Sequence, residues 1–281
     1  MDEFPQGIAH AWSFPPLPAA VIAITAFLYL RGWLIARRTR PQYLPPWAAI
    51  SFLTGLAALW IALASPIDAL DDFLLAAHML QHFLLMSIVP PLLLLGAPAV
   101  PLLHGLPRPI ITRVFAPVMR QTWFHGLARA IGNPIFAWLA MNLAYLGWHV
   151  PAAFELTLRS EHIHNLEHLC FLTTSILFWW IIISPWPAAS RLPRWAIIPY
   201  LLSADLVNTM LSAFLTFSGR VLYQSYAAAE RVTPLTPLQD QVAAGAEMWV
   251  LNSFVFLIPA ILVTVRLLSP KGLRRANVQL G

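Results

Sequence analysis

Glu161-His162-Ile163-His164-Asn165-Leu166-Glu167-His168 places three histidines and two acids directly before the apolar segment 170–184. An apolar segment of this kind is typical of a membrane span, next to which ionisable groups are costly unless something pairs or binds them. The sequence therefore predicts that this polar run lies at one end of a transmembrane helix and has partners there.

The composition predicts a polytopic membrane protein. Of the 281 residues, 59% are hydrophobic and 10% are charged, whereas a soluble domain carries about 25% charged residues. The mean hydropathy of +0.68 agrees with this class. The single cysteine, Cys170, excludes an intrachain disulfide and a metal cage built from several cysteines. The start of the chain lacks the basic region of a signal peptide, so the first apolar run is expected to be retained as a span.

Seven segments have the length and apolar character expected of spans, for which about 20 residues are needed. Pro90-Pro91 is expected to kink the third of them or end it early, and Asn133-Pro134 is a good start for the fourth. The fold prediction is an all-α membrane protein, a seven-transmembrane helix bundle forming a single polytopic membrane domain over 1–281, with spans at about 15–35, 46–64, 73–95, 135–150, 162–184, 195–217 and 243–268.

The charges predict the orientation of the bundle. Fourteen of the 17 basic residues lie at the connections after the first, third and fifth spans or towards the C-terminus, and eleven of the 12 acids lie on the other side. By the positive-inside rule, the N-terminus is outside and the C-terminus is cytoplasmic. This distribution accounts for the basic pI without nucleic acid as a partner. The long connection 96–132 is expected to be either helix pieces on the inner leaflet or a basic loop.

With this topology, six of the nine histidines lie at the outer face on three different spans. His78 and His82 are four residues apart, as are His164 and His168, so each pair shares a helix face. Imidazole is the commonest metal ligand in proteins, and thioether sulfur favours soft ions such as Cu(I). The sequence therefore predicts a metal site drawn from His78, His82, His149, His164, His168, Asp240, Met248 and Glu167, in which the acids are either ligands or support an imidazole.

Asp205 and Asn208 stand apart from this set, near the middle of the sixth span. An ionisable group at that depth is a functional candidate. The sequence leaves open a proton path, a deeper ion contact and a protonated aspartate bonded to another helix.

Four segments carry a family resemblance: His78-Met79-Leu80-Gln81-His82, His149-Val150-Pro151, Glu161 through His168, and Asp240 through Trp249. Together they resemble the membrane-embedded CtaG family of cytochrome c oxidase assembly factors, over most of the chain from the second span to the last. The resemblance implies a multi-pass protein of the bacterial cytoplasmic (inner) membrane. It would act as a respiratory-chain assembly chaperone that handles copper on the outer face. The implied partners are haem–copper oxidase subunits and a periplasmic copper carrier, beside the lipid bilayer.

Two other functions remain as alternatives. His164-Asn165-Leu166-Glu167-His168 matches the His-x-x-Glu-His pattern of inverted zinc proteases, and histidines on several helices are also found in di-iron membrane enzymes. Zinc or iron would then replace copper. A diheme protein is disfavoured, because such bundles place histidines near opposite faces. The sequence favours an assembly factor over an enzyme and leaves turnover open.

Overall fold

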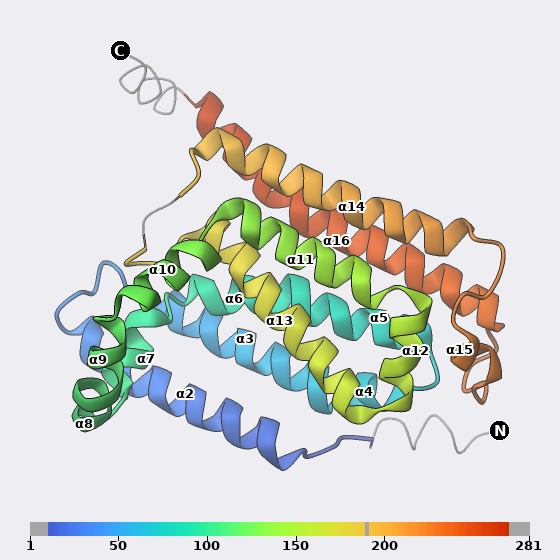
Figure 1. Ribbon diagram of the computed structural model, residues 1–281, viewed down its shortest axis with the longest axis horizontal. Helices are drawn as coiled ribbons and strands as arrows, with labels where there is room; N and C mark the ends of the chain where they lie inside the picture. Colours follow the sequence, from blue (N-terminus) through green and yellow to red (C-terminus); the bar gives the residue numbers. More distant parts are fainter. Residues whose placement is uncertain (1–10, 189–190, 270–281) are drawn as a thin grey trace.

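The computed structural model describes residues 11–188 and 191–269, and every regular element in these ranges is helical. Figure 1 shows long, roughly aligned helices with short helices at both ends of the bundle. The long helical segments are α2 (Pro16–Arg37), α3 (Pro46–Ala64), α5 (Leu75–Phe83) continued by the π-helical turn η1 (Leu84–Ile88) and α6 (Val89–Leu95), α11 (Pro134–Trp148), α13 (Glu161–Ile183), α14 (Ile197–Phe217) and α16 (Pro237–Leu268).

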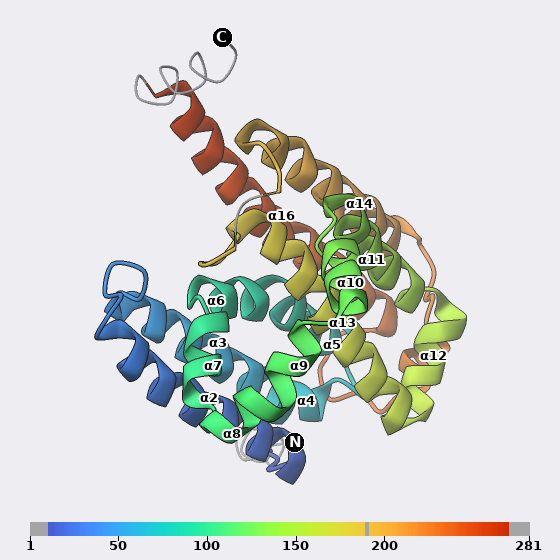
Figure 2. The ribbon, with the colours of Figure 1, turned by 60° about the vertical axis from the view of Figure 1, so that its left-hand side comes forward.

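The short helices divide between the two ends of the bundle (Figures 1 and 2). One end carries α4 (Pro66–Leu70), α12 (Pro151–Arg159) and α15 (Gln224–Ala228). The other end carries α7 (Ala99–Gly105), α8 (Arg108–Ile110), the π-helical η2 (Ile111–Phe115), α9 (Ala116–Met119), α10 (Thr122–Ile131) and the 3₁₀-helix η3 (Arg194–Ala196). The connection 96–132 therefore consists of helix pieces, as one of the two sequence hypotheses proposed.

Within the described residues, six helical segments are long and apolar enough to cross a membrane: 16–37, 46–70, 75–95, 161–183, 194–217 and 237–268. They agree closely with six of the seven predicted spans. The two largest differences are of six residues: the second segment continues through α4 to Leu70 rather than ending near residue 64, and α16 begins at Pro237 rather than near residue 243. The fourth predicted span corresponds to α11, which has 15 residues and is about 22 Å long. This is shorter than the bilayer core of about 30 Å. The seven-span count and the orientation of the termini therefore stay predictions, and Lys271, Arg274 and Arg275 lie outside the described residues.

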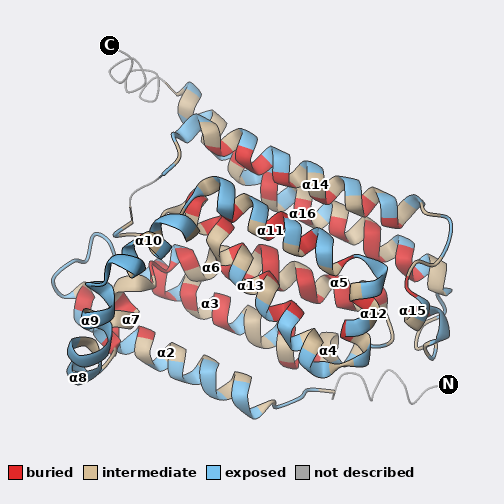
Figure 3. Cartoon of the chain, in the orientation of Figure 1, coloured by how far each residue is buried: buried red, intermediate tan, exposed pale blue. Residues whose placement is uncertain are grey.

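The outward faces of the long helices are apolar, as expected for a bundle in lipid. Figure 3 shows exposed residues along the outer sides of α2 and α14. On α14 these include Leu206, Met210 and Phe214, and on α16 they include Phe254 and Ile261. Because water would disfavour such a surface, its apolar character fits lipid contact.

Two prolines in the third segment are accommodated by a wider helical turn. Proline has no N–H, so Pro90 leaves the carbonyl of Met86, four residues before it, without its usual donor. The indole Nε1 of Trp179 on α13 donates to that carbonyl at 3.0 Å. The π-helical turn at 84–88 comes directly before the prolines, and the helix continues to Leu95 rather than ending early.

The close contact between α2 and α7 depends on two glycines. A Cβ added at Gly32 of α2 would lie 1.7 Å from the carbonyl oxygen of Pro101, and one added at Gly105 of α7 would lie 1.9 Å from that of Leu28. The backbones of α2 and α7 therefore meet directly. This contact anchors α2 to the end of the bundle opposite the histidines.

Candidate metal centre

The histidine pairs predicted from the sequence meet in space. His78 and His82 project from α5, and His164 and His168 project from α13, with the α13 acid Glu167 between the two pairs. The ring centroids of His78 and His164 are 5.1 Å apart, and those of His82 and His168 are 5.6 Å apart. We call His78, His82, His164, Glu167 and His168, together with Asp71, the His/acid cluster.

The local sequence explains why these side chains point inward. Each His pair has a spacing of four residues, which puts both rings on one face of its helix. The opposite face of α13 carries Leu166 and Leu169, which are about half exposed. His162 is also exposed, as expected for an interfacial residue. The amphipathic start of α13 thus directs its imidazoles into the bundle and its leucines outward.

The carboxylate of Glu167 lies beside the two histidines of α5. Its Oε2 is 3.8 Å from Nε2 of His78 and 3.7 Å from Nε2 of His82, and the side chain is fully buried. These distances exceed those of hydrogen bonds, which are about 2.7–3.2 Å. Two nitrogen or oxygen ligands held about 2.1 Å from one metal ion at tetrahedral angles lie about 3.4 Å apart. The spacing of these three atoms is therefore closer to that of shared metal ligands than to that of bonded partners.

Seven buried polar atoms of the cluster have no hydrogen-bond partner in the part of the chain that the structure describes. They are Nε2 of His78, His164 and His168, both ring nitrogens of His82 and both carboxylate oxygens of Glu167. Buried polar groups are bonded in the great majority of cases, and an unpaired one costs about 1–3 kcal/mol. Among these residues, His78, His82 and Glu167 offer ligand atoms within 4.8 Å of one another, which is the arrangement expected of a ligand set for a cation.

A hydrogen bond sets the tautomer of His78. The hydroxyl of Tyr226 donates to the carbonyl of Asp71 at 2.6 Å and lies 3.1 Å from Nδ1 of His78. Burial, with the nearby Asp71 carboxyl, raises the pKa of Tyr226 well above its usual value of 10.0, so the phenol keeps its single proton. Because the carbonyl of Asp71 can only accept, the phenol donates its proton to that carbonyl. Nδ1 of His78 must therefore donate to the phenol oxygen. Nε2 of His78 therefore presents a lone pair to Glu167, and two acceptors face each other.

Asp71 is a second acid of the cluster and forms another group of candidate ligands with His78 and His164. Oδ2 of Asp71 is 3.6 Å from Nε2 of His164, and Asp71, His78 and His164 offer ligand atoms within 4.8 Å of one another. Burial, with nearby Asp72 and Asp68, raises the pKa of Asp71 to about 8. A cation beside this carboxylate would stabilise its charged form. We call Asp71, His78 and His164 the outer triad and His78, His82 and Glu167 the inner triad.

His149 lies on the inner side of the cluster. Its ring centroid is 5.9 Å from that of His82. Its Nδ1 donates to the carbonyl of Tyr145 at 2.7 Å, so its Nε2 carries a lone pair, and this atom is 3.3 Å from the sulfur of Met79. The ring is thus oriented as metal-ligating imidazoles are, with one nitrogen bonded to a carbonyl and the other available.

Two predicted residues lie elsewhere. The carboxylate of Asp240 accepts hydrogen bonds from the backbone N–H groups of Leu75 at 2.8 Å and Ala76 at 3.2 Å, so it caps the start of α5. Met248 lines a separate, deeper cavity. Asp240 therefore orients the helix that carries His78 and His82, and its role as a ligand stays a prediction.

The sequence analysis did not include Asp71, Tyr226 or Met79 among the candidate site residues. Asp71 is one of three acids within five residues, Asp68, Asp71 and Asp72, before the third span. That cluster was a usable signal at the predicted outer face. Tyr226 is 148 residues from His78, and its connection has no pattern that would predict the contact.

Asp205 and Asn208 have different hydrogen-bond partners in the structure. Asp205 is half-buried and its Oδ1 accepts from the hydroxyl of Ser253 at 3.2 Å. Asn208 is buried in a network in which Tyr145 and Asn252 both donate to its Oδ1. The bond between Asp205 and Ser253 joins α14 to α16.

A buried His/acid cluster inside an apolar helical bundle defines a membrane protein with a candidate metal centre. The chain belongs to the cytochrome c oxidase caa3 assembly factor (Caa3_CtaG) family, whose model matches residues 27–269. This confirms the family resemblance read from the four sequence segments.

Curated relatives come from mycobacteria. The chain is 28% identical over 269 residues to uncharacterized proteins of Mycobacterium bovis and Mycobacterium tuberculosis, covering 93% of this chain and 39% of each relative. It is 25% identical over 262 residues to an uncharacterized protein of Mycobacterium leprae, covering 92% of this chain and 39% of the relative. The chain thus spans about two fifths of the length of these relatives. No solved structure matches it.

Proposed function

We propose that this protein assists the assembly of a haem–copper cytochrome c oxidase by binding copper as cargo in the His/acid cluster. The observation that carries the proposal is the convergence of Glu167 and the imidazoles of His78 and His82 with no hydrogen bonds among them. Membership of the assembly-factor family supports the link to the oxidase. Imidazole ligands suit copper, and they also suit zinc and iron, so the choice of copper rests on the family.

A vestibule supports access to the cluster from one end of the bundle. A cavity of about 740 Å³ is lined by Asp68, Asp71, Asp72 and Glu161, and it reaches His164 and His168. Acidic side chains around a cleft raise the local concentration of cations. His164 and Asp71 belong both to this vestibule and to the outer triad, so an ion entering the vestibule meets the outer triad first.

The shared histidine suggests how cargo moves inward. His78 belongs to both triads, but its Nδ1 is bonded to Tyr226 and only its Nε2 is available. One ion on Nε2 can exchange Asp71 and His164 for His82 and Glu167 without leaving His78. We infer that the cluster holds one ion at a time in two adjacent positions, so release would use the same steps in reverse.

The proposed setting is the bacterial cytoplasmic membrane, with seven spans and the His/acid cluster near the outer face. The family and the six apolar helices support a multi-pass membrane protein. In this topology the vestibule faces the periplasm, where a copper carrier and an oxidase subunit could exchange cargo with it. A reporter inserted near Ala228 should then be external and one fused at Gly281 should be cytoplasmic; the reverse labelling would overturn the orientation.

Copper binding is tested with the purified, chelator-treated protein under reducing conditions. The parent should take up Cu(I) in competition with a chromophoric chelator. The double variant His78→Ala/His168→Ala should bind one equivalent less of Cu(I) than the parent. His104→Ala/His125→Ala is the matched control, because both rings are exposed in the connection at the other end of the bundle. An equal Cu(I) stoichiometry in the cluster variant and the parent, with both folded by circular dichroism, would sink the proposed site.

Assembly is tested in a cell that depends on this chain. Its oxidase should lose copper when the chain is deleted and recover it with the parent gene. The cluster variant, expressed at the same level, should not restore the copper. An oxidase with full copper content in the deletion strain would contradict the assembly role, whereas the binding assay above tests the site itself.

A further inference from the structure

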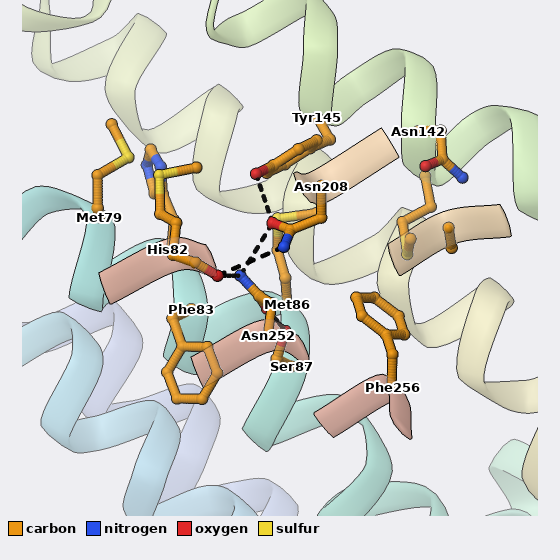
Figure 4. A pocket seen from close by; sticks show the side chains of 13 residues that line it. Met79, His82, Phe83, Met86, Ser87, Asn142, Tyr145, Asn208, Asn252 and Phe256 are labelled. Carbon is orange, nitrogen blue, oxygen red and sulfur yellow. Dashed lines mark hydrogen bonds between the residues drawn. The ribbon is translucent and has the colours of Figure 1, made fainter. Parts of the chain in front are cut away.

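A second cavity lies next to the His/acid cluster and is lined by methionines. Its volume is about 30 Å³, and its walls include Met79, Met86, Met141 and Met248 (Figure 4). These are four of the seven methionines in the chain, and all four are buried. A cavity of this size holds about one water molecule or one ion. We call it the methionine chamber.

The chamber adjoins the cluster through His82, whose side chain lines it. Both ring nitrogens of His82 lack a hydrogen-bond partner among the described residues. The ring therefore belongs to the inner triad and also borders the chamber, where Figure 4 shows it beside the Met79 side chain.

The sulfur of Met79 contacts a ring nitrogen of His149, and no hydrogen bond accounts for this contact. It lies 3.3 Å from Nε2 of His149, and the proton of that ring is on Nδ1, where it is donated to the carbonyl of Tyr145. A thioether has no proton of its own. Two lone-pair donors therefore face each other without a hydrogen between them, as two ligands of one cation do.

Hydrogen bonds within the chamber wall occupy most of its amide and hydroxyl groups. Tyr145 donates to Asn208 at 2.7 Å, Asn252 donates to the same oxygen at 3.2 Å, and Ser87 donates to Asn252 at 2.5 Å (Figure 4). This network joins four helical segments and fixes the wall. The groups that remain for a ligand are mainly thioether sulfurs and imidazole nitrogens.

We propose that the methionine chamber, together with His149, which contacts Met79 without lining the cavity, forms a second cation site. This site is specific for soft monovalent ions such as Cu(I) and Ag(I), with Met79 and His149 as ligands and with Met86 and Met248 completing the shell. Thioethers bind soft ions and are poor ligands for Zn²⁺ and other borderline divalent ions. The His/acid cluster accepts either kind of ion, whereas the chamber accepts only the soft one. This inference rests on the proposed function and defines its cargo as a soft monovalent ion.

The test compares Ag⁺, a soft probe that needs no reductant, with Zn²⁺, in titrations of the purified full chain. The parent should bind Zn²⁺ in the cluster and one more equivalent of Ag⁺ than of Zn²⁺. Met79→Leu/Met248→Leu should lose that additional equivalent, or weaken it at least tenfold, and keep its Zn²⁺ affinity. Leucine nearly conserves the volume of methionine, so the bundle is expected to remain folded. Met210→Leu is the matched control, because Met210 is on the exposed face of α14.

The outcomes separate the two proposals. Unchanged Ag⁺ binding in the double variant would overturn the chamber, and so would an equal loss of Ag⁺ and Zn²⁺ in a folded variant. An unchanged Zn²⁺ affinity in Glu167→Gln would instead contradict the cluster. Met86→Leu is a second, milder chamber variant, for which we expect weaker Ag⁺ binding and parental Zn²⁺ binding.

Discussion

Glu167→Gln should make the metal-free protein more stable and its metal binding weaker. In the metal-free chain the Glu167 carboxylate is fully buried, faces imidazole nitrogens at 3.7–3.8 Å and accepts no hydrogen bond from the described residues. Glutamine keeps the shape, removes the charge and adds N–H groups that can donate to the lone pair of His78. Metal binding needs the carboxylate, whereas the metal-free fold is destabilised by it.

The size of each effect follows from the burial. An unsatisfied buried polar group costs about 1–3 kcal/mol, and more when it is charged, so the metal-free variant should gain about that much. Loss of a group that only supports a ligand weakens metal binding by about 10- to 100-fold. Loss of Glu167, which we propose is itself a ligand, should therefore weaken metal binding at least about 100-fold. At a free metal concentration of 100 times the parental Kd, the ion stabilises the parent by about 2.7 kcal/mol and the variant by only about 0.4 kcal/mol.

Thermal unfolding in detergent, followed by the fluorescence of the 12 tryptophans, measures both effects, with chelator or with Zn²⁺. Glu155→Gln is the matched control. Its carboxylate accepts from the backbone N–H of Ser225 at 3.0 Å and also bonds the hydroxyl of that serine, so it is paired, and it offers no ligand atom to either triad. The control should therefore keep the parental response to Zn²⁺.

Two results would refute this reasoning. If Zn²⁺ raises the Tm of Glu167→Gln as much as that of the parent, the carboxylate is not a ligand. If the metal-free variant melts below the metal-free parent, Glu167 is stabilised in the empty cluster, and the unpaired-charge argument is wrong.

Three further predictions concern the supports of the site. Tyr226→Phe removes the acceptor that orients His78 and should weaken metal binding by about 10- to 100-fold with the stoichiometry retained; unchanged affinity would show that the ring needs no such support. Asp240→Ala removes the cap of α5 and should lower stability by about 1–2 kcal/mol, while at saturating metal the stoichiometry stays parental; loss of an equivalent from folded protein would make Asp240 a ligand. Gly105→Ala forces a Cβ against the α2 backbone and should cost about 1–3 kcal/mol or more. Gly126→Ala, where nothing lies within 4 Å, should be neutral or stabilising by up to about 1 kcal/mol; similar melting of the two variants would contradict the close contact.

The bundle was largely predictable because membrane helices are local features. Length, apolar character and helix-start residues are properties of single segments, and six of the seven predicted spans correspond to described helices that are long and apolar enough to cross a membrane. Asn133 illustrates this, since it caps α11 through two backbone N–H groups as expected. The start of α16 was predicted too late, because its first turns carry polar residues that a hydropathy window excludes.

The site was only partly predictable, for a related physical reason. The sequence indicated that each His pair shares a helix face, since a spacing of four residues requires it. It could not indicate that Tyr226 holds one nitrogen of His78, that Asp71 faces His164 or that Met79 faces His149. These contacts join segments about 70 to 150 residues apart or depend on how two helices are rotated against each other.

The sequence thus specified the membrane class, the main helices and the residue types of the candidate metal centre. Packing of α5, α11 and α13 and of the connection before α16 selected which donors converge and assigned Asp240 to capping. The reason is that ligand geometry depends on differences of about 1 Å between helices, and no single helix carries that information.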